Sequence, residues 1–162
     1  MTAGGGRPPG ATSRFTVIPA VHLLLVASGE ILLLRRFNTG YEDGKHSVVA
    51  GHLDGDEQAT HAMAREAAEE AGLTIAVADL ALVHVMHRRS PGEPERIDLF
   101  FSARAWQGTP GVMERDRCDE VRWWPLERLP EPMVPYVRAA IGHYRRGVVF
   151  SEFGWTRDEP AR

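Results

Sequence analysis

The sequence predicts a mixed α/β fold in which a mixed β-sheet lies between helices. Short β-branched and aliphatic runs alternate with helix-like segments, and no long repeat interrupts this order. The chain has 162 residues, of which 43% are hydrophobic and 25% charged, a composition typical of one globular domain. We therefore expect a single domain over 15–155, after a flexible leader at 1–14 and before a tail at 156–162.

The predicted domain begins with strands. Residues 15–26 (FTVIPAVHLLLV) and the apolar run at 31–36 are separated by Ala-Ser-Gly-Glu, which favours a β-hairpin. A polar, glycine-bearing loop follows at 38–45, and a short apolar segment at 47–50 ends at Gly51.

Two helices are predicted. The segment 56–71 lacks glycine and proline and is rich in alanine and glutamate, and Gly72 occupies the position expected just after a helix. The segment 133–146 is amphipathic, with apolar residues at spacings of three, four and three, at Val134, Val137, Ile141 and Tyr144. Between the helices, strands are expected at 80–87, 97–106 and 120–124.

Charge, hydropathy and cysteine usage exclude several functional classes. The 19 lysines and arginines and 22 acidic residues give a net charge of −3, which provides no field for holding a nucleic-acid duplex. The apolar runs fall far short of the roughly 20 residues that cross a bilayer, so no membrane partner is expected. A lone cysteine, Cys118, cannot form an internal disulfide, which predicts a cytoplasmic protein.

Three glutamates share one face of the first predicted helix. Glu66, Glu69 and Glu70 stand at i, i+3 and i+4, where like charges repel. A hard divalent cation would relieve that repulsion, and carboxylate oxygens suit Mg²⁺ or Mn²⁺ better than zinc or copper. Taken alone, such glutamates are also compatible with a solvated helix face.

The surrounding segment, GHLDGDEQATHAMAREAAEEAGL from Gly51, resembles the Nudix box, G-x5-E-x7-R-E-U-x-E-E-x-G-U, where U is aliphatic. Its seven fixed positions are matched by Gly51, Glu57, Arg65, Glu66, Glu69, Glu70 and Gly72. Ala67 is smaller than the aliphatic residue usual at its position, a difference that affects packing rather than chemistry. The order of the predicted elements is also similar to the α/β/α sandwich of this family.

The resemblance implies Mg²⁺-dependent hydrolysis of a nucleoside diphosphate linked to another group, with Mn²⁺ as the other candidate ion. It implies that the metal is held by the backbone carbonyl of Ala50 and by Glu66, Glu69 and Glu70. Glu66 and Glu69 are then the catalytic residues, and Glu66 is a candidate general base, although some members take the base from a later loop. The structural residues of the box are Gly51, Glu57, Arg65 and Gly72, with Arg65 expected to pair with an acid such as Glu57.

Substrate-binding residues are less sharply specified. Arg35 and Arg36 occupy a position similar to that of a phosphate-contacting arginine in MutT-type members, or form an ordinary pair of charges at a strand end. Glu114 and Glu120 lie near the loop that often supplies a further acidic ligand or base, and spacing does not choose between them.

The resemblance leaves the substrate open among small nucleotides. The first hypothesis is a nucleoside triphosphate, cleaved to the monophosphate and pyrophosphate. The alternatives are ADP-ribose, a nucleotide sugar or a dinucleotide, and a sensor that binds a nucleotide without turnover. The segment PLERLPEPMVPY lacks the tryptophan and paired aspartates that read the base in oxidised-purine triphosphatases, which argues against oxidised guanine. The oligomeric state is not specified.

Overall fold

The computed structural model describes residues 14–155, so the predicted tail and all of the predicted leader except Arg14 lie outside the described residues. Strands and helices interleave along the chain as expected. The elements are β1 (Ile18–Leu23), β2 (Val26–Ala27), β3 (Glu30–Arg36), β4 (His46–Ser47), β5 (Ala50–His52), α1 (Ala59–Ala71), the 3-10 helix η1 (Val77–Asp79), β6 (Leu80–Arg88), β7 (Arg96–Ala103), β8 (Cys118–Pro125), α2 (Pro135–Arg145) and β9 (Phe150–Phe153).

The strands form two sheets, and the predicted mixed α/β fold is confirmed. The larger sheet has the order β5-β1-β7-β6-β9, in which β1 and β7 are parallel and β6 and β7 antiparallel. The smaller sheet is built on β3, which pairs antiparallel with β2, β4 and β8. Strand β5 pairs with β1 at the edge of the larger sheet, beside α1.

The predicted hairpin is only partly correct. Strand β2 does turn back on β3 through Ser28 and Gly29, which both have positive φ. The main strand of that segment, β1, belongs to the other sheet, because Leu24 and Leu25 carry the chain from one sheet to the next. Both residues are fully buried, which accounts for the unbroken apolar run in the sequence.

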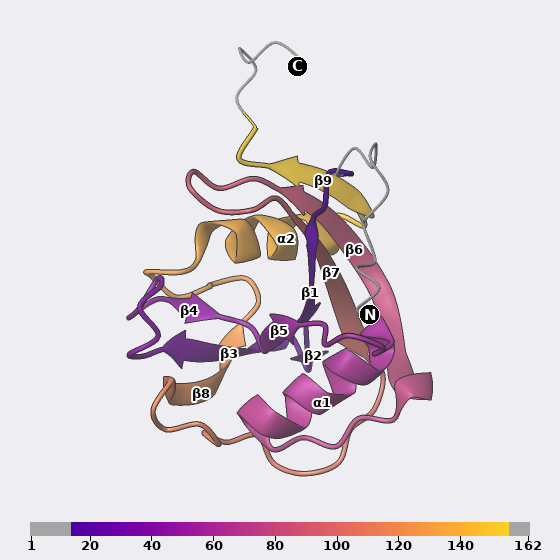
Figure 1. Cartoon of the computed structure of the whole chain (residues 1–162). Helices are drawn as coiled ribbons and strands as arrows, with labels where there is room; N and C mark the ends of the chain where they lie inside the picture. The colour runs from indigo at the N-terminus through magenta and orange to yellow at the C-terminus, as the bar shows by residue number, and fades with distance from the viewer. Residues whose placement is uncertain (1–13, 156–162) are drawn as a thin grey trace, which may run out of the picture.

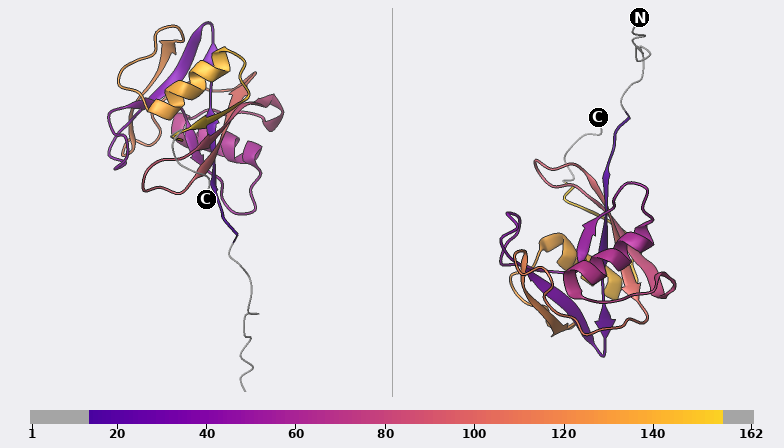
Figure 2. Two further views of the ribbon diagram at one scale, coloured as in Figure 1. Left: turned by 90° about the horizontal axis from the view of Figure 1, so that it is seen from above. Right: turned by 60° about the horizontal axis from the view of Figure 1, so that its bottom comes forward.

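The two helices lie on opposite sides of the strands, as Figure 1 and the right view of Figure 2 show. Successive residues of β3 alternate between two cores: Leu32 packs in the core under α1, and Leu33 in the core under α2. This arrangement is the expected α/β/α sandwich. No helix within residues 14–155 is long and apolar enough to span a membrane.

Helix α1 begins later than predicted and ends where predicted. Asp56 has a φ of 61°, outside the helical region, and the helix starts only at Ala59. At the other end Gly72 adopts the left-handed conformation with a φ of 70°, and its N–H donates to the carbonyl of Ala68. The next residue, Leu73, is fully buried and fixes the direction in which the chain leaves the helix.

Candidate active site

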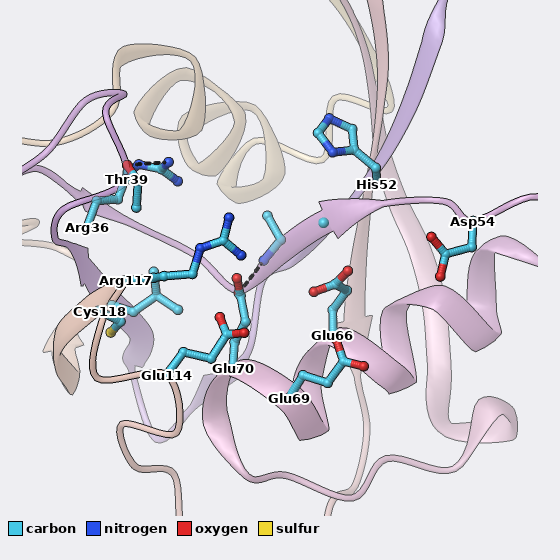
Figure 3. A pocket seen from close by; sticks show the side chains of 13 residues that line it. Arg36, Thr39, His52, Asp54, Glu66, Glu69, Glu70, Glu114, Arg117 and Cys118 are labelled. Atoms are coloured by element: carbon cyan, nitrogen blue, oxygen red, sulfur yellow. Dashed lines mark hydrogen bonds between the residues drawn. The ribbon is translucent and has the colours of Figure 1, made fainter.

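A cavity of about 390 Å³ lies between α1, β5 and the segment that enters β8. Figure 3 shows Glu66, Glu69 and Glu70 extending from α1 into this cavity, and Glu114 and Arg117 reaching it from the segment before β8. Backbone hydrogen bonds from Arg117 and Cys118 to the carbonyl of Glu114 form the turn that presents these two side chains. Acidic groups from two distant segments therefore meet in one place.

Glu70 is the most enclosed of the three helix carboxylates. Its Oε2 accepts a hydrogen bond from the backbone N–H of Ala50 at 3.0 Å, which ties the end of α1 to β5. Burial raises the pKa of Glu70 to about 8, and the Ala50 hydrogen bond offsets only part of that effect. The positive charge of Arg36 also lowers the pKa of Glu70, but its effect is smaller than that of burial.

Glu66 reaches the cavity only because residue 51 is glycine. A Cβ atom built on Gly51 would lie 1.9 Å from Oε1 of Glu66, well inside van der Waals contact. The Glu66 side chain is only 12% exposed, and burial raises its pKa despite a hydrogen bond from Arg65. The position of the Glu66 carboxylate therefore depends on the absence of a side chain at residue 51.

Arg65 holds the loop before α1 against the helix. Its Nε and Nη2 donate to the two carboxylate oxygens of Glu57 at 2.8 and 2.9 Å. Its Nη1 donates to Glu66 at 2.8 Å and to Glu69 at 3.2 Å. The two bonds to Glu57 hold its pKa at about 2. The bonds to Glu66 and Glu69 orient these two carboxylates in the cavity.

The donor set of the cavity fits a hard divalent cation. Its lining has more carboxylates than guanidinium groups, with Asp54, Glu66, Glu69, Glu70 and Glu114 against Arg36 and Arg117. Cys118 is an unsuitable ligand because burial raises its thiol pKa and its Sγ donates to the Glu120 carbonyl. Among residues 14–155, no group of three or more Asp, Glu, His or Cys side chains is arranged to hold a metal ion by itself. An ion that keeps several waters and takes ligands from phosphate, as Mg²⁺ does, suits such an open cluster.

The cavity includes some of the predicted substrate-binding residues and not others. Arg36 and Glu114 line it. Arg35 lies outside it, donating to both carboxylate oxygens of Asp119 at 2.8 and 3.0 Å. Glu120 also lies outside and contacts Nε2 of His46 at 3.1 Å.

Residues missed by the sequence analysis come from loops and a strand end. Arg117, Thr39 and His52 all line the cavity. The loop that carries Thr39 is held by Asp43, which accepts from the backbone N–H groups of Thr39 and Gly40. Loop residues of this kind have no periodic spacing, so their only signal was proximity in sequence to the predicted strand end and loops.

A second cavity, of about 300 Å³, adjoins the first. The two share Arg36 and the whole of β5, Ala50 to His52. In Figure 3 the ring of His52 lies on the opposite side of the β5 ribbon from the carboxylate of Glu66. The two cavities therefore meet at β5.

An acidic cavity on one helix of an α/β/α sandwich, flanked by arginines, defines an enzyme class that acts on phosphates with the help of a divalent cation. The family model of the NUDIX domain matches residues 16–143, most of the chain. The chain therefore belongs to the Nudix family, and it is a Nudix pyrophosphohydrolase. Enzymes of this family generally use divalent metal ions and act on small nucleotides.

Solved structures of other proteins have the same fold as this chain. A MutT NUDIX hydrolase from Burkholderia pseudomallei is 26% identical, with 78% of this chain and 97% of that chain covered and a TM-score of 0.73. A MutT protein from Methanosarcina mazei is 24% identical over 82% of this chain and 95% of that one, with a TM-score of 0.70. The NUDIX domain of Shewanella oneidensis NrtR, complexed with ADP ribose, is 16% identical over 85% and 92%, with a TM-score of 0.68.

Proposed function

We propose that this protein hydrolyses a nucleoside diphosphate linked to another group, with Mg²⁺ as its cation and Mn²⁺ as a substitute. One observation carries the proposal: Glu66, Glu69 and Glu70 line a single cavity together with Arg36 and Arg117. Carboxylates and guanidinium groups in one cavity suit a metal–phosphate complex, because the acids bind the metal and the arginines bind phosphate oxygens.

Each residue has a defined part in this reaction. The carbonyl of Ala50 and the three helix glutamates would hold the cation, which polarises phosphate oxygens and lowers the pKa of bound water when present. Glu66 is the candidate base, and Arg65, hydrogen-bonded to both Glu66 and Glu69, keeps their carboxylates aligned. Glu114 faces the same cavity and is the further acidic ligand or base that fits this geometry, in preference to Glu120.

We propose a nucleoside triphosphate as the first substrate candidate. Arg36 and Arg117 place two guanidinium groups around the acidic cavity, which suits a run of phosphates. A nucleotide sugar or ADP-ribose is the second candidate, because the adjoining second cavity has room for a group at the other side of β5. The ADP ribose bound by the NrtR domain supports that candidate by analogy of fold.

The substitution Glu69→Gln tests the proposal directly. Its side chain is 52% exposed, so the change should leave the fold intact while removing one metal ligand. We expect turnover to fall by roughly 100-fold or more, on the scale seen when electrostatic stabilisation is lost. The matched control is Glu127→Gln, because Glu127 is 81% exposed and pairs with Arg145 outside the cavity. Wild-type turnover by the Glu69 variant would refute the assignment.

A further inference from the structure

The segment from Gln107 to Arg117, between β7 and β8, brings Glu114 into the acidic cavity (Figure 3). Backbone hydrogen bonds anchor both of its ends. At one end, Gln107 and Thr74 exchange two bonds of 2.9 and 3.0 Å. At the other end, the carbonyl of Arg117 accepts from the N–H of Phe37, just after β3. Glu114 lies between the two anchors, so its position also depends on how the middle of the segment packs.

The middle of the segment packs on the C-terminal end of α1, where glycines face each other. The backbone N–H of Gly111 donates to the carbonyl of Ala71, the last residue of the helix, at 3.1 Å. A Cβ atom built on Gly108 would lie 2.9 Å from the carbonyl oxygen of Gly72. Gly108 also has a φ of 94°, in a region that other residues rarely adopt. Both the close approach of the two backbones and the conformation therefore require glycine at position 108.

The side chain of Met113 lies across this contact. A Cβ atom built on Gly72 would lie 2.8 Å from its Cε and 3.2 Å from its Sδ, and one built on Gly111 would lie 3.5 Å from its Cε. Met113 is 52% exposed, and its unbranched side chain follows the surface that the two glycines leave open. Because Met113 directly precedes Glu114, any movement of its side chain away from α1 also shifts Glu114.

Electrostatic repulsion opposes the position of Glu114. Burial is the main reason that the pKa values of Glu66 and Glu70 are raised, and the negative charge of Glu114 raises both of them further. The carboxylates of the helix and of the segment are therefore close enough to repel one another when no cation lies between them. Contacts outside the cavity must hold the segment against this repulsion.

We propose that Gly108 and Met113 are positioning residues for Glu114. They dock the segment on Gly72 of the box, and this docking holds Glu114 near the helix glutamates before a cation binds. Because the segment is ordered in advance, metal binding does not have to supply the free energy of ordering it. This inference rests on the proposed function, because it assumes that Glu114 acts as a metal ligand or base in the reaction.

A double-mutant cycle with Glu114→Gln tests the inference. Gly108→Ala and Met113→Ala are each made alone and in combination with Glu114→Gln. The dissociation constant of Mn²⁺, added without nucleotide, is measured by calorimetry, and kcat is measured with Mg²⁺ on a hydrolysed nucleotide. Met113→Leu is the conservative variant. Gly147→Ala is the matched control, because Gly147 also has a positive φ, of 69°, but nothing lies within 4 Å of an added Cβ.

We expect Glu114→Gln to weaken Mn²⁺ binding or to lower kcat by about tenfold or more. Whichever property it lowers, Gly108→Ala and Met113→Ala should each lower the same property by about three- to tenfold. Met113→Leu should stay within about twofold of the wild type, and so should Gly147→Ala. In the Glu114→Gln protein, neither Gly108→Ala nor Met113→Ala should cause a further loss beyond about twofold, because the group that they position is gone.

Other results overturn the inference. Losses of the same size with and without Glu114→Gln would show that the two contacts act by a route other than Glu114. Wild-type Mn²⁺ binding and kcat in Met113→Ala would exclude its role, even if Gly108→Ala does not fold. An equal loss in Gly147→Ala would make the effect one of general stability, and a Glu114→Gln protein without any loss would leave nothing to position. The proposed function fails on a separate observation, namely that the wild type hydrolyses no nucleoside diphosphate derivative with Mg²⁺.

Discussion

At Gly51 the backbone of β5 passes so close to α1 that no side chain fits between them. The nearest atom to an added Cβ is Oε1 of Glu66, the candidate base. No φ in the left-handed region constrains Gly51, so the requirement for glycine here is one of space. The glycine of the box therefore serves the chemistry of the glutamate fifteen residues later.

The substitution Gly51→Ala should impair catalysis with little effect on folding. The new methyl group must displace the Glu66 carboxylate, and we expect kcat to fall by at least about tenfold because catalytic groups tolerate little misplacement. Gly55→Ala is the control, since nothing lies within 4 Å of an added Cβ at that position. Steady-state kinetics and thermal unfolding of both variants make the comparison. Equal activity of the two variants would contradict the close contact between residue 51 and the Glu66 carboxylate.

The residues that could be predicted for the site are those on the helix. The spacing of Glu66, Glu69 and Glu70 places them on one face whatever surrounds them, and the structure places all three in the cavity. Arg117 and His52 could not be identified because their position depends on how loops and a strand end fold back. Arg35 and Arg36 are adjacent, and the alternation of side chains along a strand sends only one of them into the cavity.

Among the elements, local signals predicted helices well and strand pairing poorly. Gly72 marked the end of α1 because the residue after a helix often adopts the left-handed conformation, which glycine adopts most easily. The partner of β1 was mispredicted, because its pairing with β7 is formed by residues more than seventy positions apart. Strand β9 was not predicted at all; its four residues pair in parallel with β6 at the edge of the larger sheet.

Three neighbouring strands are joined by one buried polar network. Asp98 on β7 accepts from His22 on β1 and from Arg88 on β6. Burial alone would raise the pKa of Asp98, yet these hydrogen bonds and the nearby positive charges hold it below its usual value. The substitution Asp98→Asn should therefore lower the free energy of unfolding by about 3 kcal/mol at pH 7, because the charge of Arg88 stays buried without its partner.

This loss should depend on pH in a defined direction. A carboxyl whose folded-state pKa is depressed stabilises the fold above its unfolded pKa of about 3.9 and loses that effect as the pH falls through the folded value. The difference between wild type and Asp98→Asn in urea unfolding should thus narrow below about pH 4. The exposed pair Asp119–Arg35 supplies the control, since Asp119→Asn should cost less than about 1 kcal/mol. Equal costs for the two substitutions would count against the buried network.

At the scale of the whole molecule, the protonation of Glu70 in the cavity should affect the free energy of unfolding. Its folded-state pKa of about 8 exceeds the unfolded value of about 4.3, so the folded state binds more protons between those values. In EDTA, the free energy of unfolding should therefore decrease as the pH rises from about 5 to 8. A bound cation favours the ionised carboxylate, so Mg²⁺ should raise the melting temperature more at pH 8 than at pH 6.

Thermal unfolding of Glu70→Gln checks the origin of this dependence. The variant should lose most of the decrease in stability with pH and most of the Mg²⁺ response. Glu127→Gln, at an exposed position outside the cavity, should keep both. A Glu70→Gln protein that retains the wild-type pH dependence would show that the enclosed carboxylate does not cause it.

The most direct test of the central claim is product analysis by mass spectrometry, with Mg²⁺ and with EDTA. The panel comprises nucleoside triphosphates, ADP-ribose, nucleotide sugars and dinucleotides, each given to the wild type and to Glu69→Gln. We predict a nucleoside monophosphate from at least one substrate, released only by the wild type with Mg²⁺. Pyrophosphate as the second product supports the triphosphate candidate, and a sugar phosphate supports the second candidate. Hydrolysis that persists in EDTA, or that Glu69→Gln performs equally well, would contradict the proposed metal-dependent site.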